Sequence, residues 1–524
     1  MSVVDRLLDR TASFVATTSE RLNPILVKET RQSTKSAMFS TIFLLFVAIS
    51  WIVIVMGTLI MGSTLETEPS AEIFFAWNYG LLSFAIFVVV PFGAYRSLLA
   101  ERELHTLDLL TITTLSPRQI VFGKLGSALV QVAVYYSAIA PFIAFLSFLQ
   151  GFDILLISWV MVMSFFWSLA LCTGALLASI SARHNQWNSA NMVGLIILLL
   201  FGWIMTLSLA VAGQLQREMD DAFFWLVNAV VLVFGLSYVF LATQVIVACL
   251  TFASGNRSTG IRLVLSGQFW LLVIGFGVLL LVPVSSFGPR DYHEVFAMVG
   301  LLVSIHWAVG GLFLVTESDF LSRRIRSRLP RGRSVRLLVS PFLPGSSRGL
   351  VLVYGHLLVM MLILLLAAVD LGPTASNMPF DSGPVMGLIC VFNAVFWVGI
   401  AAALARWCRG LSHRFTPMTV RVLIVVLFIV VQLVSILPAE IHVRDQVLLE
   451  SLSFLNPFLL MEMSPGSLPI GLGLLSCVAL LAVLVNLRAM YQGMMRIVRD
   501  PGPGQLPPKP STPPQSGEVA PSAQ

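Results

Sequence analysis

The sequence predicts an all-α, polytopic transmembrane helix bundle with about 12 spans, arranged as six followed by six. Hydrophobic residues make up 57% of the 524 residues, and charged residues make up only 11%. Soluble domains usually carry about 25% charged residues, so this chain has too little charge to cover a soluble surface. Apolar runs of about the 20 residues needed to cross a bilayer recur along the whole chain.

Twelve apolar runs are long enough to be spans. They cover residues 38–62, 73–94, 120–149, 154–181, 189–212, 223–252, 265–285, 293–316, 349–369, 385–407, 419–437 and 468–488. Lys and Arg favour the cytoplasmic side of a membrane during insertion. All but three of the 32 Lys and Arg residues, namely Arg217, Arg290 and Arg444, fall on the same side as the amino end. We therefore expect a multi-pass protein of the cell inner (plasma) membrane with both termini in the cytoplasm.

Residues 1–37 form a polar segment before the first span. They hold no apolar run long enough for a signal peptide, so the first span is expected to remain uncleaved. Within "NPILVKETRQ", Asn23 suits a helix N-cap and Pro24 suits the first helical position. A short amphipathic helix that includes Glu29 could lie on the cytoplasmic membrane face. An ordinary basic flank that fixes the orientation of the chain is the alternative.

A well-charged stretch, "RSLLAERELHTLDLLTITTLSPRQIVFGK", separates the second and third spans. Residues from Leu98 to about Ile112 favour a helix with an apolar face and a charged face. Ser116 and Pro117 then break it, because the residue before a proline avoids the helical region. We expect a two-faced helix at about 98–117 that presents charges to a soluble partner. These charges are Glu101, Arg102, Glu103 and Asp108.

This stretch resembles the first cytoplasmic loop of ABC-2 type permeases of ATP-binding-cassette exporters. That loop typically reads close to E-R-E-x-G-T-L-E-L-L-L-T-T-P-L-S-P-x-x-I-V-x-G-K. The matching positions are Glu101, Arg102, Glu103, Thr106, Leu107, Leu109, Leu110, Thr113, Leu115, Ser116, Pro117, Ile120, Val121, Gly123 and Lys124. The chain differs at His105, where the family has Gly, and at Thr114, where it has Pro. "NPILVKETRQ" also resembles the family's interfacial helix, and the resemblance covers about residues 20–252.

The resemblance implies that the chain is the permease subunit of an ABC-type exporter of an unknown substrate. A separate cytoplasmic ABC ATPase subunit, in two copies, would bind ATP and Mg and dock on a coupling helix. The implied coupling-helix residues are Glu101, Arg102, Glu103, Thr106, Leu107, Asp108, Ser116 and Pro117. Asn23, Pro24 and Glu29 would set the interfacial helix. Further partners would be membrane lipid and a second permease or a second copy of the chain, but no nucleic acid.

The chain itself is not expected to be an enzyme or to bind a cofactor. It lacks the G-x-x-x-x-G-K-[ST] loop that cradles nucleotide phosphates. His293 and Glu294 lack the second histidine of a zinc-binding H-E-x-x-H motif, so no metal site is predicted. A non-transporting scaffold or sensor with a permease-like fold is the alternative function.

An ion-coupled secondary transporter is a weaker alternative, because such carriers keep ionisable groups in mid-membrane. The spans hold no central Asp, Glu, Lys or Arg. His306 and His356 are the titratable exceptions, and each is expected to hydrogen-bond a neighbouring helix.

The rest of the chain divides into two parts. Residues 253–500 form an additional six-span membrane domain, after the permease-like domain at 38–252. Its loop 317–348 carries "SRRIRSRLPRGRSVR", which either attracts anionic lipid head groups or simply orients the second half. Residues 501–524 hold eight prolines and almost no large apolar side chains, so a disordered tail is expected.

Overall fold

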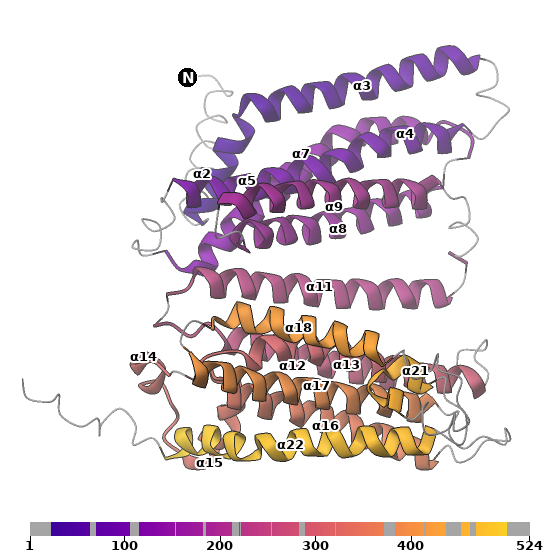
Figure 1. Ribbon diagram of the computed structural model, residues 1–524. Helices are drawn as coiled ribbons and strands as arrows, with labels where there is room; N and C mark the ends of the chain where they lie inside the picture. The colour runs from indigo at the N-terminus through magenta and orange to yellow at the C-terminus, as the bar shows by residue number, and fades with distance from the viewer. Residues whose placement is uncertain are drawn as a thin grey trace, which may run out of the picture. The chain divides into compact units, whose positions relative to one another are not determined.

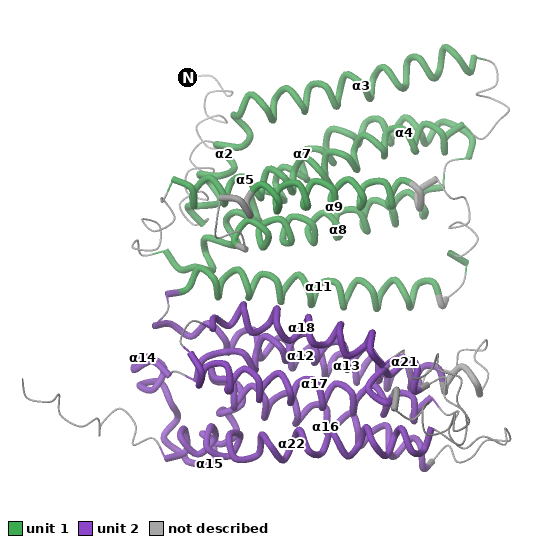
Figure 2. Tube along the Cα trace, in the orientation of Figure 1, with its two compact units in different colours: residues 1–251 green, residues 252–524 purple. Residues whose placement is uncertain are grey.

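The fold is all-α in the part of the chain that the structure describes (Figure 1). This is a computed structural model, and it describes residues 23–62, 70–104, 115–151, 153–181, 185–211, 219–220, 222–252, 254–281, 289–319, 321–370, 383–412, 415–435, 452–461 and 468–499. The chain forms two compact units, residues 1–251 and 252–524 (Figure 2). The division falls beside the junction at 252/253 expected from the sequence. Each unit is described by itself below.

The described part of unit 1 contains a short helix followed by the first six spans. Its elements are α2 (Pro24–Thr34), α3 (Ala37–Met61), α4 (Ala71–Phe84), the π-helix η2 (Ala85–Val89), α5 (Val90–Glu103), α7 (Pro117–Leu146), α8 (Ile154–Ser181), α9 (Asn185–Val211) and α11 (Ala222–Leu250). The helices α4, η2 and α5 are continuous and together form the second span. The π turn ends two residues before Pro91, which has no N–H to donate within the helix.

Unit 2 holds the other six spans. Its elements are α12 (Thr259–Leu281), α13 (Pro289–Val315), α14 (Arg323–Arg326), α15 (Arg333–Val339), the 3-10 turn η3 (Ser340–Phe342), α16 (Ser346–Asp370), α17 (Gly383–Leu411), α18 (Pro417–Val434), the 3-10 turn η4 (Leu452–Leu455), α21 (Pro457–Met461) and α22 (Leu468–Val498). The two short helices α14 and α15 lie in the connection between the spans α13 and α16.

The predicted span count is confirmed for the described residues, which contain twelve helices long and apolar enough to cross a membrane. Each one overlaps one of the twelve predicted runs. Two helices extend well beyond their predicted ends: the second runs to Glu103 rather than 94, and the last runs to Val498 rather than 488. The prediction of a separate helix that begins at Leu98 is therefore wrong: Leu98 to Glu103 continue the second span. Residues 105–114, with Thr106, Leu107 and Asp108, lie outside the described residues.

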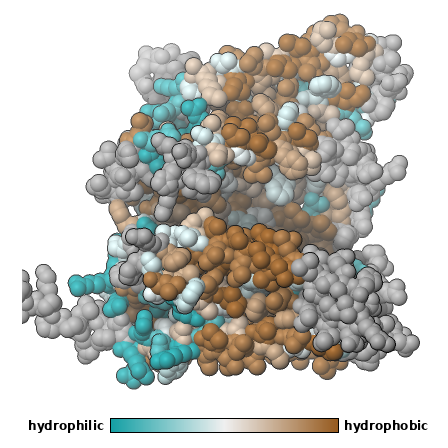
Figure 3. Space-filling view, viewed as in Figure 1, coloured by the Kyte–Doolittle hydropathy of each residue, from teal (hydrophilic) through white to brown (hydrophobic). Residues whose placement is uncertain are grey.

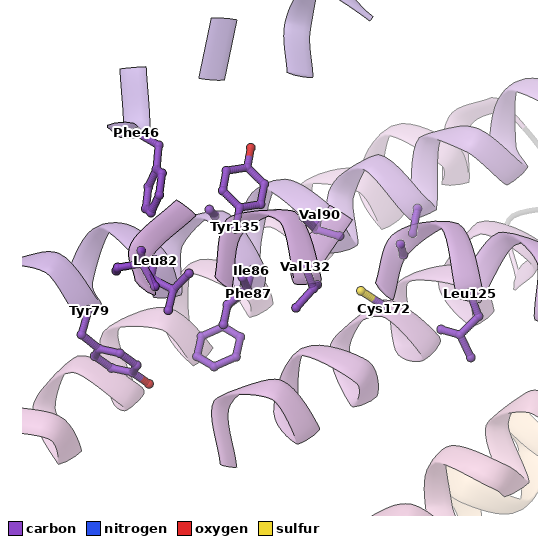
Figure 4. Close-up of a cluster of buried hydrophobic side chains, with 14 of the residues drawn as sticks. Phe46, Tyr79, Leu82, Ile86, Phe87, Val90, Leu125, Val132, Tyr135 and Cys172 are labelled. Carbon is purple, nitrogen blue, oxygen red and sulfur yellow. The ribbon is translucent and has the colours of Figure 1, made fainter. Parts of the chain in front are cut away.

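The core of unit 1 forms where the second span packs against α7 and α8. Leu82, Ile86 and Phe87 of the second span are fully buried, as are Val132 and Tyr135 of α7 (Figure 4). Many other large apolar side chains are exposed, and in Figure 3 hydrophobic residues form a broad surface. Such a surface is suited to lipid rather than to water.

The core of unit 2 depends on close packing of the spans α13 and α17. Gly300 of α13 faces Gly387 of α17 so closely that a Cβ atom added to Gly300 would overlap the partner's backbone. Small residues at such crossings let membrane helices approach and gain van der Waals contact.

Candidate functional site

Four helices of unit 1 meet around a group of charged side chains at one end of the spans. The group comprises Lys28 and Glu29 of α2, Glu101 and Arg102 of α5, and Lys124 of α7; we call it the base cluster. Arg102 extends it to the carboxyl end of α8. In the sequence, the cluster residues of α5 precede residues 105–114 and the cluster residue of α7 follows them, because α5 ends just before this segment and α7 begins just after it.

Lys124 is the centre of the base cluster. Its side chain is only 2% exposed, and its ammonium group lies 3.1 Å from Oε1 of Glu29 and 3.2 Å from Oε1 of Glu101. It also donates to the carbonyl oxygen of Ser97, at 3.3 Å. A buried charge is tolerated when it is paired and hydrogen-bonded, as Lys124 is here.

Lys28 is the second cation near Glu29 and Glu101. With Lys124 it gives two positive and two negative groups, so their formal charges sum to zero. Its ammonium group lies 3.7 Å from Glu101 and 3.9 Å from Glu29, and its side chain is 58% exposed. Solvent screens Lys28 far more than Lys124, so most of the electrostatic stabilisation resides in the contacts of Lys124.

Helix α2 begins as predicted, at an asparagine followed by a proline. The Oδ1 atom of Asn23 accepts a hydrogen bond from the N–H of Ile25 at 3.1 Å, and Pro24 takes the first helical position. The Asn23 amide also donates to the carbonyl oxygen of Gln119 at 2.5 Å, which joins the start of α2 to the start of α7. Glu29 is buried at 9% exposure, so α2 directs a carboxylate inward.

Two glycines of α7 allow α2 to lie against it. A Cβ atom at Gly123 would lie 2.8 Å from Cβ of Ile25, and one at Gly126 would lie 3.0 Å from Cδ1 of Leu26. Both distances are shorter than ordinary contacts between carbon atoms. The absence of side chains at these positions therefore sets the separation of α2 and α7, and with it the distance from Glu29 to Lys124.

Ser116 and Pro117 start α7, in agreement with the predicted helix break. The Ser116 hydroxyl accepts from the N–H of Gln119 at 3.3 Å, and the Gln119 side chain accepts from the N–H of Ser116 at 2.8 Å. This reciprocal capping box fixes where the helix begins. Ser116 and Pro117 are thus capping residues of the third span.

Arg102 is bound to α8. Its guanidinium donates to the carbonyl oxygens of Ser179, at 3.0 Å, and of Ile180, at 3.1 Å. The last carbonyl groups of a helix have no intrahelical partner. A cation that binds them also interacts favourably with the negative end of the helix dipole. Arg102 therefore joins the end of α5 to the end of α8.

Two of the four charges expected to face a soluble partner bind groups of their own chain instead. Glu101 is 12% exposed and pairs with Lys124, and Arg102 binds α8. Glu103, by contrast, is exposed. Docking of an ATPase on this stretch stays a prediction, and Glu103 is the exposed one among the three expected docking charges that the structure describes.

The central role of Lys124 was missed, because in the sequence it is only one of the positions that match the ABC-2 permease loop. The pairing brings together three helices from distant parts of the chain, and no spacing within the charged stretch encodes it. The small residues Gly123 and Gly126 beside Lys124 are the one local signal of a closely packed neighbour.

Unit 2 has its own buried charge cluster, centred on Arg262 at the start of α12. This side chain is 0% exposed and donates to Oε2 of Glu317 at 2.6 Å and to the carbonyl oxygens of Pro341 and Gly345 at 2.8 and 2.9 Å. The N–H of Gly345 also donates to Glu317, at 3.2 Å. Gly345 has φ +138°, a conformation that favours glycine. These contacts fix the connection between α13 and α16.

The two intramembrane histidines differ in their partners. His306 lies 3.0 Å from the carbonyl oxygen of Leu265 on α12, so the expected bond to a neighbouring helix is confirmed. His356 instead bonds the carbonyl oxygen of Leu352 in its own helix, at 2.8 Å, so the expectation is wrong for it. Its ring lies among the rings of Phe269 and Trp307, each with a centroid separation of 4.7 Å. Within the described ranges, no group of three or more His, Cys, Asp or Glu residues could hold a metal ion.

Comparison with known proteins adds no relative. No family model matches the chain, and no curated protein or solved structure matches it either.

Proposed function

We propose that this chain is the permease subunit of an ABC-type exporter, which moves an unidentified substrate with energy from ATP hydrolysed by a separate ATPase subunit. The proposal depends on the resemblance between residues 101–124 and the coupling loop of ABC-2 permeases. One structural observation supports it further. The two ends of that loop, Glu101 and Lys124, are joined to each other and to Glu29 of α2.

This arrangement suits the transmission of force. A partner that binds residues 105–114 would hold both chain ends that lead into the second and third spans. Because the base cluster couples α2, α5, α7 and α8, a displacement of the loop would move these helices together rather than bend one of them. ATP and Mg would be bound by the ATPase, with two copies per complex, and this chain would supply only the moving membrane part.

The proposal now divides the charged residues into two roles. Glu101 and Arg102 position the loop, because their side chains bind Lys124 and α8. Glu103 and the segment with Thr106, Leu107 and Asp108 would contact the ATPase. This division replaces the expectation that Glu101, Arg102 and Glu103 dock together.

The test is to purify the full chain with any ABC ATPase that accompanies it and to measure ATP hydrolysis in nanodiscs. The double variant Glu103→Arg/Asp108→Arg is expected to insert normally but to lose the ATPase subunit. Glu72→Arg is the matched control, since Glu72 is also an exposed carboxylate of the second span but lies at its opposite end. The double variant retaining a fully stimulated ATPase would rule out docking at this loop. An ATPase that binds wild type with an unchanged rate of hydrolysis would support the scaffold or sensor alternative.

A further inference from the structure

The connection between α13 and α16 carries a dense positive charge. Residues 321–339, which we call the basic arm, contain seven arginines and no Asp or Glu. Six of these arginines are exposed: Arg323, Arg324, Arg326, Arg328, Arg331 and Arg333. The seventh, Arg336, is buried and donates to the carbonyl oxygen of Pro330 at 2.6 Å, which folds the arm back on itself.

The basic arm is fixed to unit 2 by an apolar core of its own. Leu321, Ile325 and Leu329 pack with Leu343, which precedes α16, and with Ile497 of α22, and all five are buried. The Ser322 hydroxyl caps α14 and donates to the carbonyl oxygen of Ser254 at 2.8 Å. The exposed arginines are therefore held close to the ends of membrane spans and are not spread along a loose loop.

Helix α15 adds apolar side chains to the charged surface. Val335 and Leu338 are 48% and 74% exposed, and they lie three residues apart on one side of the helix. The next span begins at Ser346, seven residues after α15 ends at Val339, so α15 lies near the start of a membrane span in the sequence. Exposed apolar residues beside cations are typical of segments that lie in a bilayer interface.

The nearest carboxylates on the chain are directed elsewhere. Glu317 pairs with Arg262, and Asp319 accepts from the N–H of Ser347 at 3.2 Å. In Figure 3 hydrophilic residues gather at the end of unit 2 where Figure 1 places α14 and α15.

We propose that the basic arm is a binding site for the head groups of anionic phospholipids in the adjacent membrane leaflet. The arginines would pair with lipid phosphates, while Val335 and Leu338 would enter the boundary between head groups and acyl chains. The charge distribution of the chain predicts that this leaflet is the cytoplasmic one, which is rich in anionic lipid. The apolar pair favours lipid over free phosphate or an acidic protein, because it gains contacts only at the bilayer.

The test uses the full chain in nanodiscs of phosphatidylcholine, with or without phosphatidylglycerol. Native mass spectrometry measures retained lipid, and hydrogen exchange measures the amides of residues 333–339. We expect the wild type to retain phosphatidylglycerol and to slow exchange in α15 only when this lipid is present. The triple variant Arg323→Gln/Arg324→Gln/Arg328→Gln should lower the retained signal by about tenfold or more and lose the protection.

A matched variant, Arg31→Gln/Arg96→Gln/Arg118→Gln, removes the same charge from exposed positions of unit 1 and should behave like wild type. Equal thermal stability in pure phosphatidylcholine nanodiscs would show that the arm variant is folded. Three results would overturn the proposal: unchanged lipid retention in the arm variant, equal losses in both variants, or release of the lipid by millimolar inorganic phosphate. Loss of a protein partner with phosphatidylglycerol retention intact would assign the arm to an acidic protein surface instead.

Discussion

Lys124 of α7 holds its ammonium group 3.1 Å from Oε1 of Glu29, a residue of α2 that lies 95 positions earlier in the chain. Glu101 of α5 accepts the same cation at 3.2 Å, so one side chain ties together three helices. The arrangement requires all three groups, because removal of the cation leaves two carboxylates without their buried counter-charge.

Replacing Lys124 with Met is expected to destabilise unit 1 by about 3–5 kcal/mol, the usual cost of breaking a buried ion pair on one side. The check is denaturant or thermal unfolding of the protein in detergent. Adding Glu101→Gln to Lys124→Met should recover part of the loss, since it removes one of the two stranded charges. Arg118→Met, at an exposed position six residues earlier in α7, should change stability little. Equal stability of wild type and Lys124→Met would contradict the buried-pair interpretation.

Gly123→Ala should displace α2. The new Cβ atom would lie 2.8 Å from Ile25, so α2 must move or the protein must accept an overpacking cost of about 1–3 kcal/mol. We expect faster hydrogen exchange in residues 24–34 with little change elsewhere. Gly93→Ala is the control, because a Cβ atom there meets nothing within 4 Å. Unchanged exchange in α2 would mean that the helix is not held by this contact.

Arg102→Gln should loosen the end of α8. The variant loses charge-assisted hydrogen bonds to the carbonyl oxygens of Ser179 and Ile180, at a cost of about 1–3 kcal/mol. Hydrogen exchange over residues 176–181 should rise, whereas Arg96→Gln, at an exposed position of α5, should leave it unchanged. A rise of equal size in both variants would argue against a specific cap.

In unit 2, Glu317→Gln should be strongly destabilising, by about 2–4 kcal/mol, because the fully buried Arg262 would lose its counter-charge. Thermal unfolding measures the loss. Glu294→Gln serves as the control, since Glu294 is an exposed carboxylate at the start of the preceding span. If the two variants unfold at the same temperature, the Arg262 pair is not a determinant of stability.

The spans could be predicted because lipid imposes a simple requirement, a continuous apolar helix, that a single sequence displays directly. The ends of the helices were harder to predict where charged residues continue a helix beyond its apolar run. Leu98 to Glu103 illustrate this, since they belong to the second span although three of them are charged. The start of α2 was predictable because its signals, Asn23 and Pro24, are local.

Charged residues of the base cluster could be identified from the sequence, but their pairing could not. Glu101 and Arg102 were predicted as charges directed at a partner, and Glu29 as part of a separate interfacial helix. A sequence records which residues are charged, whereas their partners depend on how helices cross in space. Arg262 in unit 2 is a second example. Its side chain is fully buried and its partner Glu317 is 55 positions away, but in the sequence it cannot be told apart from a basic residue that flanks a span.

The five-residue π-helix at Ala85–Val89 determines the direction of the α5 charges. A π turn contains one residue more than an α turn, so it rotates everything beyond it by about 100° around the helix axis. Deleting one residue from 85–89 would restore a plain α-helix and swing Glu101 to a different side of α5, away from Lys124. The direction in which the α5 charges point around the helix axis is thus set by one extra residue in the π-helix. That residue lies within an apolar segment that contains no charged residue.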